Sequence, residues 1–86
     1  MRQRFRGYDP AQVDAFLDRC AAALALRAAD FPELHGRGGL VTGPRVTPEQ
    51  VAQAQFRVRM RGYGLDEVDA LLDRVEAALR QVDEHT

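Results

Sequence analysis

The 86-residue sequence predicts an all-α protein made of two similar turn-plus-helix units. When the chain is offset by 55 residues, 13 of the 21 positions in 4–24 are identical to those in 59–79. Each copy carries an Arg-Gly-Tyr turn, followed by apolar residues at helical spacing. A unit this small buries little apolar surface alone, so we expect the two helices to pair, either within the chain or in a homodimer.

The repeat divides the chain into three parts. We expect a first copy in residues 1–29, a linker in 30–45 and a second copy in 46–86. Thirteen residues (46–58) lead into the second turn, whereas only residues 1–3 precede the matching part of the first copy. We therefore interpret the first copy as truncated at its N-terminal side.

The first helix is predicted to begin after Asp9. Aspartate is a good N-cap, Pro10 suits the first helical position, and Gln12 stands where a capping-box partner belongs. One face of this helix is apolar and is expected to form its pairing seam. The seam residues are Val13, Leu17, Cys20 and Leu24.

The segment from 30 to 45 contains many helix breakers and has no apolar period, so it is expected to be a linker or a loosely ordered loop. His35 in this segment and His85 near the C-terminus have no partners that would indicate a metal or catalytic role. The single cysteine, Cys20, is expected to be a small core residue in a reducing compartment.

The second copy begins with a capping-box pattern, Thr47-Pro48-Glu49-Gln50, which predicts a short helix ending near Phe56. Apolar and arginine residues then alternate over 56–61, which favours an extended segment or short strand. Gly62 ends any helix at that point.

The last helix has the stronger heptad pattern, in which apolar residues recur at intervals of four and three. Gly64-Leu65 replaces the Asp-Pro of the first copy, so this helix is expected to be capped by Asp66 or less well. The seam is too short to hold an isolated dimer, so other contacts are expected. Its residues are Val68, Leu72, Val75, Leu79 and Val82.

The Arg-Gly-Tyr turns contain Gly7-Tyr8 and Gly62-Tyr63. Glycine at these positions permits a positive φ or a close backbone approach. The tyrosines are expected to pack over the start of the following helix, with the hydroxyl groups left to water or a cap. Acidic pairs follow at i,i+4 on each helix and are expected to be solvated: Asp14 with Asp18, and Asp69 with Asp73.

Each turn is also strongly basic, because arginines alternate along the segment before each helix while most acids lie in the helices. One interpretation is a membrane-surface anchor, an apolar tip ringed by cations. The other is that the apolar residues are core and the arginines pair with helix acids. The residues concerned are Phe5, Arg6, Met60, Arg61, Arg4 and Arg59, with Arg2 and Arg57 completing the two clusters.

The order of these elements resembles a known family. Residues 46–51 read VTPEQV, a phenylalanine follows at 56, and residues 59–75 read RMRGYGLDEVDALLDRV. Residues 5–20 read FRGYDPAQVDAFLDRC, which matches the turn and helix alone. This ordered combination resembles the N-terminal domain of the DivIVA family of bacterial polar and septal scaffold proteins.

The resemblance implies a short leading helix, an extended crossing loop with the turn, and a helix that enters a parallel coiled coil in an intertwined dimer. It also implies that the apolar residue before the turn's arginine enters the membrane and that this arginine contacts phospholipid. Phe5 with Arg6 and Met60 with Arg61 match that pair, with methionine replacing the usual phenylalanine. The family's long coiled-coil tail has no counterpart in this sequence, which argues against a role in curvature sensing.

We therefore expect a non-enzymatic cytoplasmic interaction module related to cell division or polar growth, peripheral at the inner face of the membrane. Its expected partners are itself, an anionic membrane surface, and cell-division or coiled-coil proteins. No catalytic set, metal cluster, cofactor motif, signal peptide or membrane span is evident. A protein–protein adaptor without membrane affinity is the alternative. An arginine-based nucleic-acid binder is disfavoured by the net charge of −1.

Overall fold

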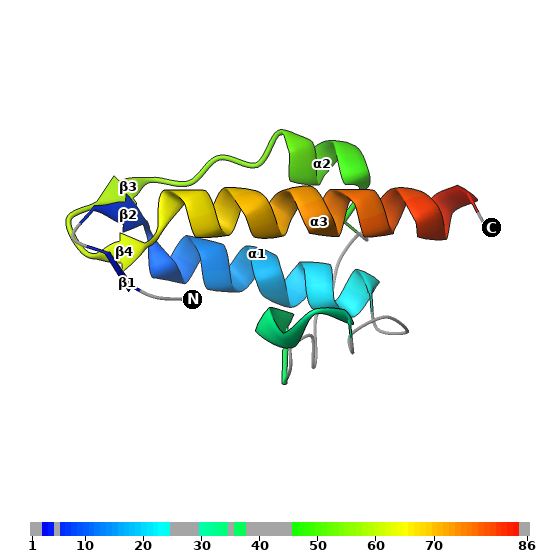
Figure 1. Ribbon diagram of the computed structural model, residues 1–86, viewed down its shortest axis with the longest axis horizontal. Helices are drawn as coiled ribbons and strands as arrows, with labels where there is room; N and C mark the ends of the chain where they lie inside the picture. Colours follow the sequence, from blue (N-terminus) through cyan, green and yellow to red (C-terminus); the bar gives the residue numbers. More distant parts are fainter. Residues whose placement is uncertain (1–2, 5, 25–29, 35, 38–45, 85–86) are drawn as a thin grey trace.

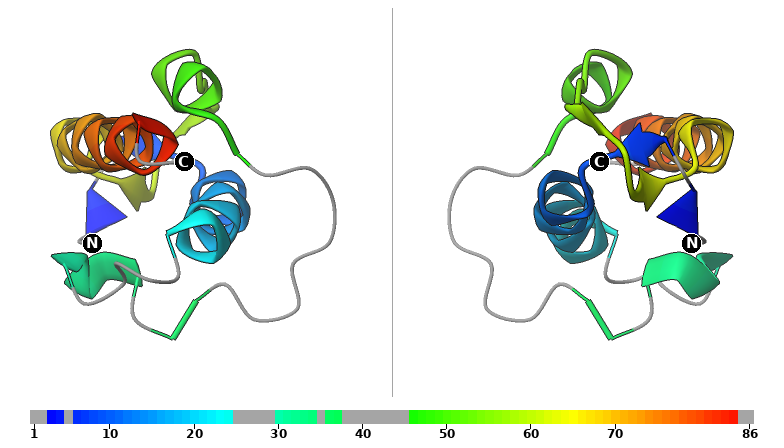
Figure 2. Two further views of the ribbon diagram at one scale, coloured as in Figure 1. Left: turned by 90° about the vertical axis from the view of Figure 1, so that its right-hand side faces the viewer. Right: turned by 90° about the vertical axis from the view of Figure 1, so that its left-hand side faces the viewer.

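The computed structural model describes residues 3–4, 6–24, 30–34, 36–37 and 46–84. Two helices, α1 (Pro10–Ala23) and α3 (Leu65–Glu84), run parallel and side by side from a small sheet at one end of the molecule (Figures 1 and 2). A short helix, α2 (Pro48–Ala52), packs against α3. A 3₁₀ turn, η2 (Pro32–Leu34), packs against α1.

The sheet consists of four two-residue strands: β1 (Gln3–Arg4), β2 (Gly7–Tyr8), β3 (Val58–Arg59) and β4 (Gly62–Tyr63). Their order is β1-β4-β2-β3, and every neighbouring pair is antiparallel. The all-α prediction is therefore wrong. The extended segment predicted over 56–61 is confirmed, because it contains β3.

The sheet forms because the two Arg-Gly-Tyr turns cross each other, so that Tyr8 pairs with Tyr63. A Cβ atom on Gly7 would clash with the carbonyl oxygen of Tyr63 and lie 2.6 Å from the carbonyl carbon of Gly62. The same holds for Gly62 against Tyr8 and Gly7. Close backbone approach is thus the reason for both glycines. This contact joins segments far apart in the chain, so local spacing could not reveal the sheet.

The helix starts agree in most respects with the predicted caps. The Asp9 carboxylate accepts a hydrogen bond from the backbone N–H of Ala11 at 3.0 Å, and Pro10 opens α1. Gln12 does not act as predicted in a capping box at Asp9, since its carboxamide oxygen accepts a hydrogen bond from the backbone N–H of Arg57 at 2.8 Å. This bond ties the second copy's approach segment to the first copy's helix.

In the second copy, Thr47 and Gln50 form the predicted capping box of α2. The helix ends at Ala52, however, earlier than the predicted end near Phe56. Helix α3 begins at Leu65, and the Gly64 carbonyl accepts the first helical hydrogen bond, from Val68, at 3.0 Å.

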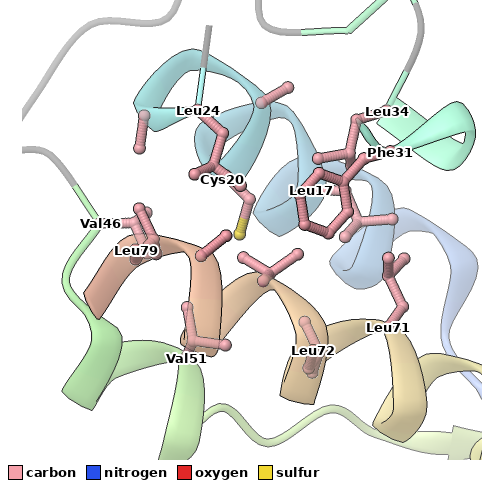
Figure 3. Packing of buried hydrophobic residues seen from close by; sticks show 14 of the residues in the cluster. Leu17, Cys20, Leu24, Phe31, Leu34, Val46, Val51, Leu71, Leu72 and Leu79 are labelled. Atoms are coloured by element: carbon pink, nitrogen blue, oxygen red, sulfur yellow. The ribbon is translucent and has the colours of Figure 1, made fainter. Parts of the chain in front are cut away.

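The core lies between α1 and α3 (Figure 3). Eight of the nine predicted seam residues are buried, and the ninth, Val82, is partly buried against the core. The two helices thus meet within one chain, one of the two arrangements that the sequence allowed. The buried eight are Val13, Leu17, Cys20, Leu24, Val68, Leu72, Val75 and Leu79.

Two different segments cover the helix pair on opposite sides (Figure 2). On one side lies α2, with Pro48 and Val51 buried. On the other lie residues 30–34 and 36–37, which we call the strap. Phe31 and Leu34 of the strap are 4% and 1% exposed and belong to the core. Part of the expected linker is therefore a packed element of the fold.

Candidate functional site

The sheet brings the basic turns of both copies to one end of the helix pair (Figure 1). We call this end the basic tip and define it by Arg6, Arg57, Val58, Arg59, Met60 and Arg61. All six residues are exposed, with Met60 at 69% and Val58 at 50%. Met60 is therefore not a core residue, which removes one of the two interpretations of that position. Phe5 lies outside the described residues, and the Arg4 side chain is likewise not described.

One arginine of the basic tip is partly engaged. The Nε atom of Arg59 lies 3.3 Å from Oδ2 of Asp9, a carboxylate in a residue only 8% exposed. The backbone N–H of Asp9 also donates to the Arg57 carbonyl at 2.7 Å. Asp9 thus caps α1 and holds the second copy's turn against the first copy's helix.

Below the tip, each tyrosine reaches the helix of the other copy. The Tyr8 hydroxyl donates to Oδ1 of Asp69 at 3.0 Å, and the Tyr63 hydroxyl donates to Oδ1 of Asp14 at 2.9 Å. The prediction that these hydroxyls are left to water or a cap is therefore wrong, because the turns cross before the helices begin. Burial first, and then the neighbouring carboxylate, raises the pKa of Tyr8 and of Tyr63.

The two tyrosine–aspartate bonds are related by the 55-residue offset of the repeat, since Tyr63 matches Tyr8 and Asp69 matches Asp14. The close approach of Gly7 and Gly62 follows the same relation. The sheet end of the molecule therefore has an approximate internal two-fold arrangement, in which each copy completes the other.

The strap is held on α1 by an arginine clamp. The Arg37 guanidinium lies 2.8 Å from Oδ1 of Asp14 and 3.1 Å from Oδ1 of Asp18. The prediction of solvated charges is wrong for this pair of acids. Burial would lower the pKa of Arg37, but hydrogen bonds to Asp14 and Asp18 outweigh it and raise that pKa. No local pattern links residue 37 to residues 14 and 18, so sequence reasoning missed the clamp.

A second clamp joins the strap to α3. Arg74 lies 2.8 Å from Oε2 of Glu33, and its guanidinium stands over the Phe31 ring, 5.2 Å from the centroid. Burial acts to raise the pKa of Glu33, but hydrogen bonds from its own backbone and from Arg74 outweigh burial and lower that pKa. The only sequence signal for this contact is the Phe-Pro-Glu-Leu segment itself, with two apolar residues flanking a proline and an acid.

An open groove lies on the other flank of α1, where residues 53–57 pass over the helix. Phe56 packs edge-on against Phe16 and Tyr8, with ring centroids 5.7 and 5.5 Å apart. The adjoining cavity has a volume of about 330 Å³. We call it the α1 groove; it is lined by Gln12, Ala15, Phe16, Arg19, Gln55 and Phe56.

The single cysteine, Cys20, is buried in the core. Burial raises the pKa of the Cys20 thiol to about 12, against a smaller lowering by Arg19, so the thiol is a core group and not a nucleophile at neutral pH. The described residues contain no cluster of three or more His, Cys, Asp or Glu side chains that could hold a metal ion. Within the same part of the chain, no helix is both long and apolar enough to cross a membrane.

Comparisons with known proteins give two partial matches. Residues of this chain are 55% identical over 29 positions to the cell cycle protein GpsB of Levilactobacillus brevis, covering 34% of this chain and 25% of that protein. They are 43% identical over 44 positions to GpsB of Geobacillus thermodenitrificans, covering 46% of this chain and 45% of that protein. The chain thus spans less than half the length of the curated relatives it matches. No family model and no solved structure matches.

GpsB is a cell-division protein of the DivIVA family. The two matches therefore support, over short segments, the resemblance drawn from the Arg-Gly-Tyr turn and the helix that follows it.

Proposed function

We propose that this chain is a non-enzymatic adaptor of bacterial cell division that docks on the anionic inner face of the membrane through its basic tip. The partial similarity to the cell cycle protein GpsB supports the cell-division context. The observation that carries the membrane part is the position of Met60, which is 69% exposed and flanked by Arg59 and Arg61.

The tip has the chemistry that a membrane surface requires. Met60 and Val58 offer apolar surface that gains free energy when it leaves water, at roughly 25 cal/mol per Å². Each arginine near an anionic leaflet contributes about 1 kcal/mol, so three or four arginines bring several kcal/mol at low salt. The acids lie mainly on the helix bodies, so an approach with the tip first keeps them away from the lipid.

A second candidate function is an adaptor that binds only proteins. It is favoured by the Arg59–Asp9 ion pair, which ties one tip arginine to the protein itself and weakens its attraction to lipid. In this case the cell-division context would remain, and the tip would contact an acidic protein surface.

Vesicle sedimentation separates the two functions. The wild-type chain should sediment with phosphatidylglycerol vesicles and stay in solution with phosphatidylcholine vesicles. The double variant Met60→Ser/Arg61→Gln should bind at least tenfold more weakly, because it loses one cation of about 1 kcal/mol and the inserted side chain. Arg80→Gln, which makes the same charge change on the body of α3, is the matched control and should bind within about twofold of wild type.

Equal sedimentation of the wild type and the double variant, or no sedimentation of either, would exclude the membrane function and leave the protein-binding adaptor. Circular dichroism of each variant confirms that the fold is intact, which is expected because Met60 and Arg61 are exposed.

A further inference from the structure

The α1 groove corresponds, by the 55-residue offset, to a surface of α3 on which the strap contacts Arg74. Ala15 and Arg19 are identical to Ala70 and Arg74, whereas Gln12 corresponds to Glu67 and Phe16 to Leu71. On α3, the strap engages this surface at Arg74: Phe31 lies beneath the Arg74 guanidinium and Glu33 forms an ion pair with it.

The strap presents an aromatic ring and a carboxylate to α3. Phe31 is 4% exposed and provides a buried aromatic ring, while Glu33, two residues later, provides a carboxylate 2.8 Å from Arg74. One arginine therefore receives both the face of a ring and a carboxylate, and Pro32 keeps the segment between them short and stiff.

On α1, the corresponding surface is open. Its cavity of about 330 Å³ lies within the range of sites that hold small ligands or single large side chains. The walls are apolar at Ala15, Phe16 and Phe56, and Arg19 stands at the place that Arg74 takes on α3. The strap is clamped to the opposite flank of α1 through Asp14 and Asp18, so it does not fill this groove.

We propose that the α1 groove binds a segment of a partner protein that carries an aromatic residue followed two positions later by a carboxylate, the pattern of Phe31-Pro32-Glu33. The ring would pack against the edges of Phe16 and Phe56, and the carboxylate would bind Arg19. A guanidinium has five N–H donors, so Arg19 can add this carboxylate to the contacts it already makes.

This inference goes beyond the proposed membrane docking and does not depend on it. The basic tip lies at the sheet, whereas the α1 groove lies along the helix and is lined by none of the tip residues. A chain that fails to bind vesicles can still bind the peptide, and the reverse also holds.

The test uses the chain's own strap sequence as the probe, a fluorescein-labelled peptide Asp-Phe-Pro-Glu-Leu, with binding measured by fluorescence anisotropy on the full 86-residue chain. The wild type should bind it. Ala15→Trp fills the groove from an exposed position and should weaken binding at least tenfold. Ala77→Trp, the same change at an exposed position of α3 outside the groove, should bind within about twofold of wild type.

Two further probes test the chemistry. A peptide with alanine in place of phenylalanine, and a peptide with glutamine in place of glutamate, should each bind several-fold more weakly. Absence of wild-type binding at millimolar peptide would overturn the proposal. Equal binding by Ala15→Trp would also overturn it, because the peptide would then be displacing the tethered strap from α3.

Discussion

The two sides of the helix pair are covered by unlike means. On one side, α2 is a capped helical turn that presents Pro48 and Val51 to the core. On the other, the strap presents Phe31 and Leu34 and is fastened by two ion-paired clamps, Arg37 to α1 and Arg74 from α3. Both sides bury apolar residues, but their charged contacts differ in closeness. Each clamp of the strap contains an ion pair at 2.8 Å, whereas the Arg80–Glu49 pair between α3 and α2 is 3.7 Å long.

This difference shows how one short chain holds two copies of a unit when only one copy has a leading helix among the described residues. The α2 side is ordered largely by local signals, since its cap and its helix lie within a few residues of each other. The strap has one 3₁₀ turn of its own and is placed by partners on both helices. The connection between the copies thus serves as a covering element.

The largest expected effect on stability comes from truncating a core side chain of the strap. Leu34→Ala removes a side chain that is 1% exposed and should lower the free energy of unfolding by about 2–5 kcal/mol, measured by urea denaturation. Val51→Ala on the α2 side deletes less buried apolar volume and should cost roughly 1.5 kcal/mol or more.

The exposed Leu65, at 37%, provides the matched control, since Leu65→Ala makes the same chemical change outside the core. It should cost less than about 1 kcal/mol. A cost for Leu34→Ala no larger than that of Leu65→Ala would mean that the strap does not pack on the helix pair in solution, and the contrast between the two sides would be lost.

A smaller effect on stability is expected from removing the arginine clamp that holds the strap on α1. Arg37→Gln removes the ion pairs to Asp14 and Asp18, whose side chains are 39% and 45% exposed, so the cost should be about 1 kcal/mol at low salt. In 1 M NaCl most of that difference should vanish, because the Debye length falls to about 3 Å.

Arg80→Gln is the control. It breaks an exposed i,i+4 pair with Glu76 at 2.9 Å and a longer exposed pair with Glu49 of α2 at 3.7 Å, and it should cost at most about 0.5 kcal/mol. If Arg37→Gln costs no more than Arg80→Gln at low salt, the Arg37 clamp adds nothing beyond an exposed ion pair, and the strap is held by its buried residues and by Arg74. The strap side and the α2 side would then differ less in how they are held than the ion pairs of the strap suggest.

How much of this fold the sequence predicts depends on the range of each interaction. The caps at Asp9 and Thr47 were predicted because cap and helix are chain neighbours. The seam from Val13 to Leu24 follows from a period that any amphipathic helix shows. The sheet and the strap contacts join residues 19 to 61 positions apart, and no local pattern specifies which partner is chosen.

How well the candidate binding surfaces can be predicted also depends on the range of the contacts that form them. The arginines of the basic tip could be found from alternation alone, but the exposure of Met60 could not. Met60 lies between β3 and β4, and the position of these strands depends on their pairing with the first copy. Arg37 carried no signal, since a single charge between glycines is usually solvated, and the Phe-Pro-Glu-Leu segment around Glu33 does not specify Arg74 as its partner. The α1 groove depends on Phe56 crossing α1, a contact of the second copy with the first.

The smallest expected effect is an acid sensitivity confined to the strap side. Because the pKa of Glu33 is lowered in the fold, the stability it contributes is present above its unfolded value and is lost as pH falls through the folded value. Urea denaturation from pH 6 to 3 should therefore show wild type and Glu33→Gln differing by about 0.5–1 kcal/mol at pH 6 and converging below pH 4. A constant difference across this range would show that the Arg74–Glu33 contact does not depend on charge. Phe31 beneath the Arg74 guanidinium would then account for the second clamp by packing alone.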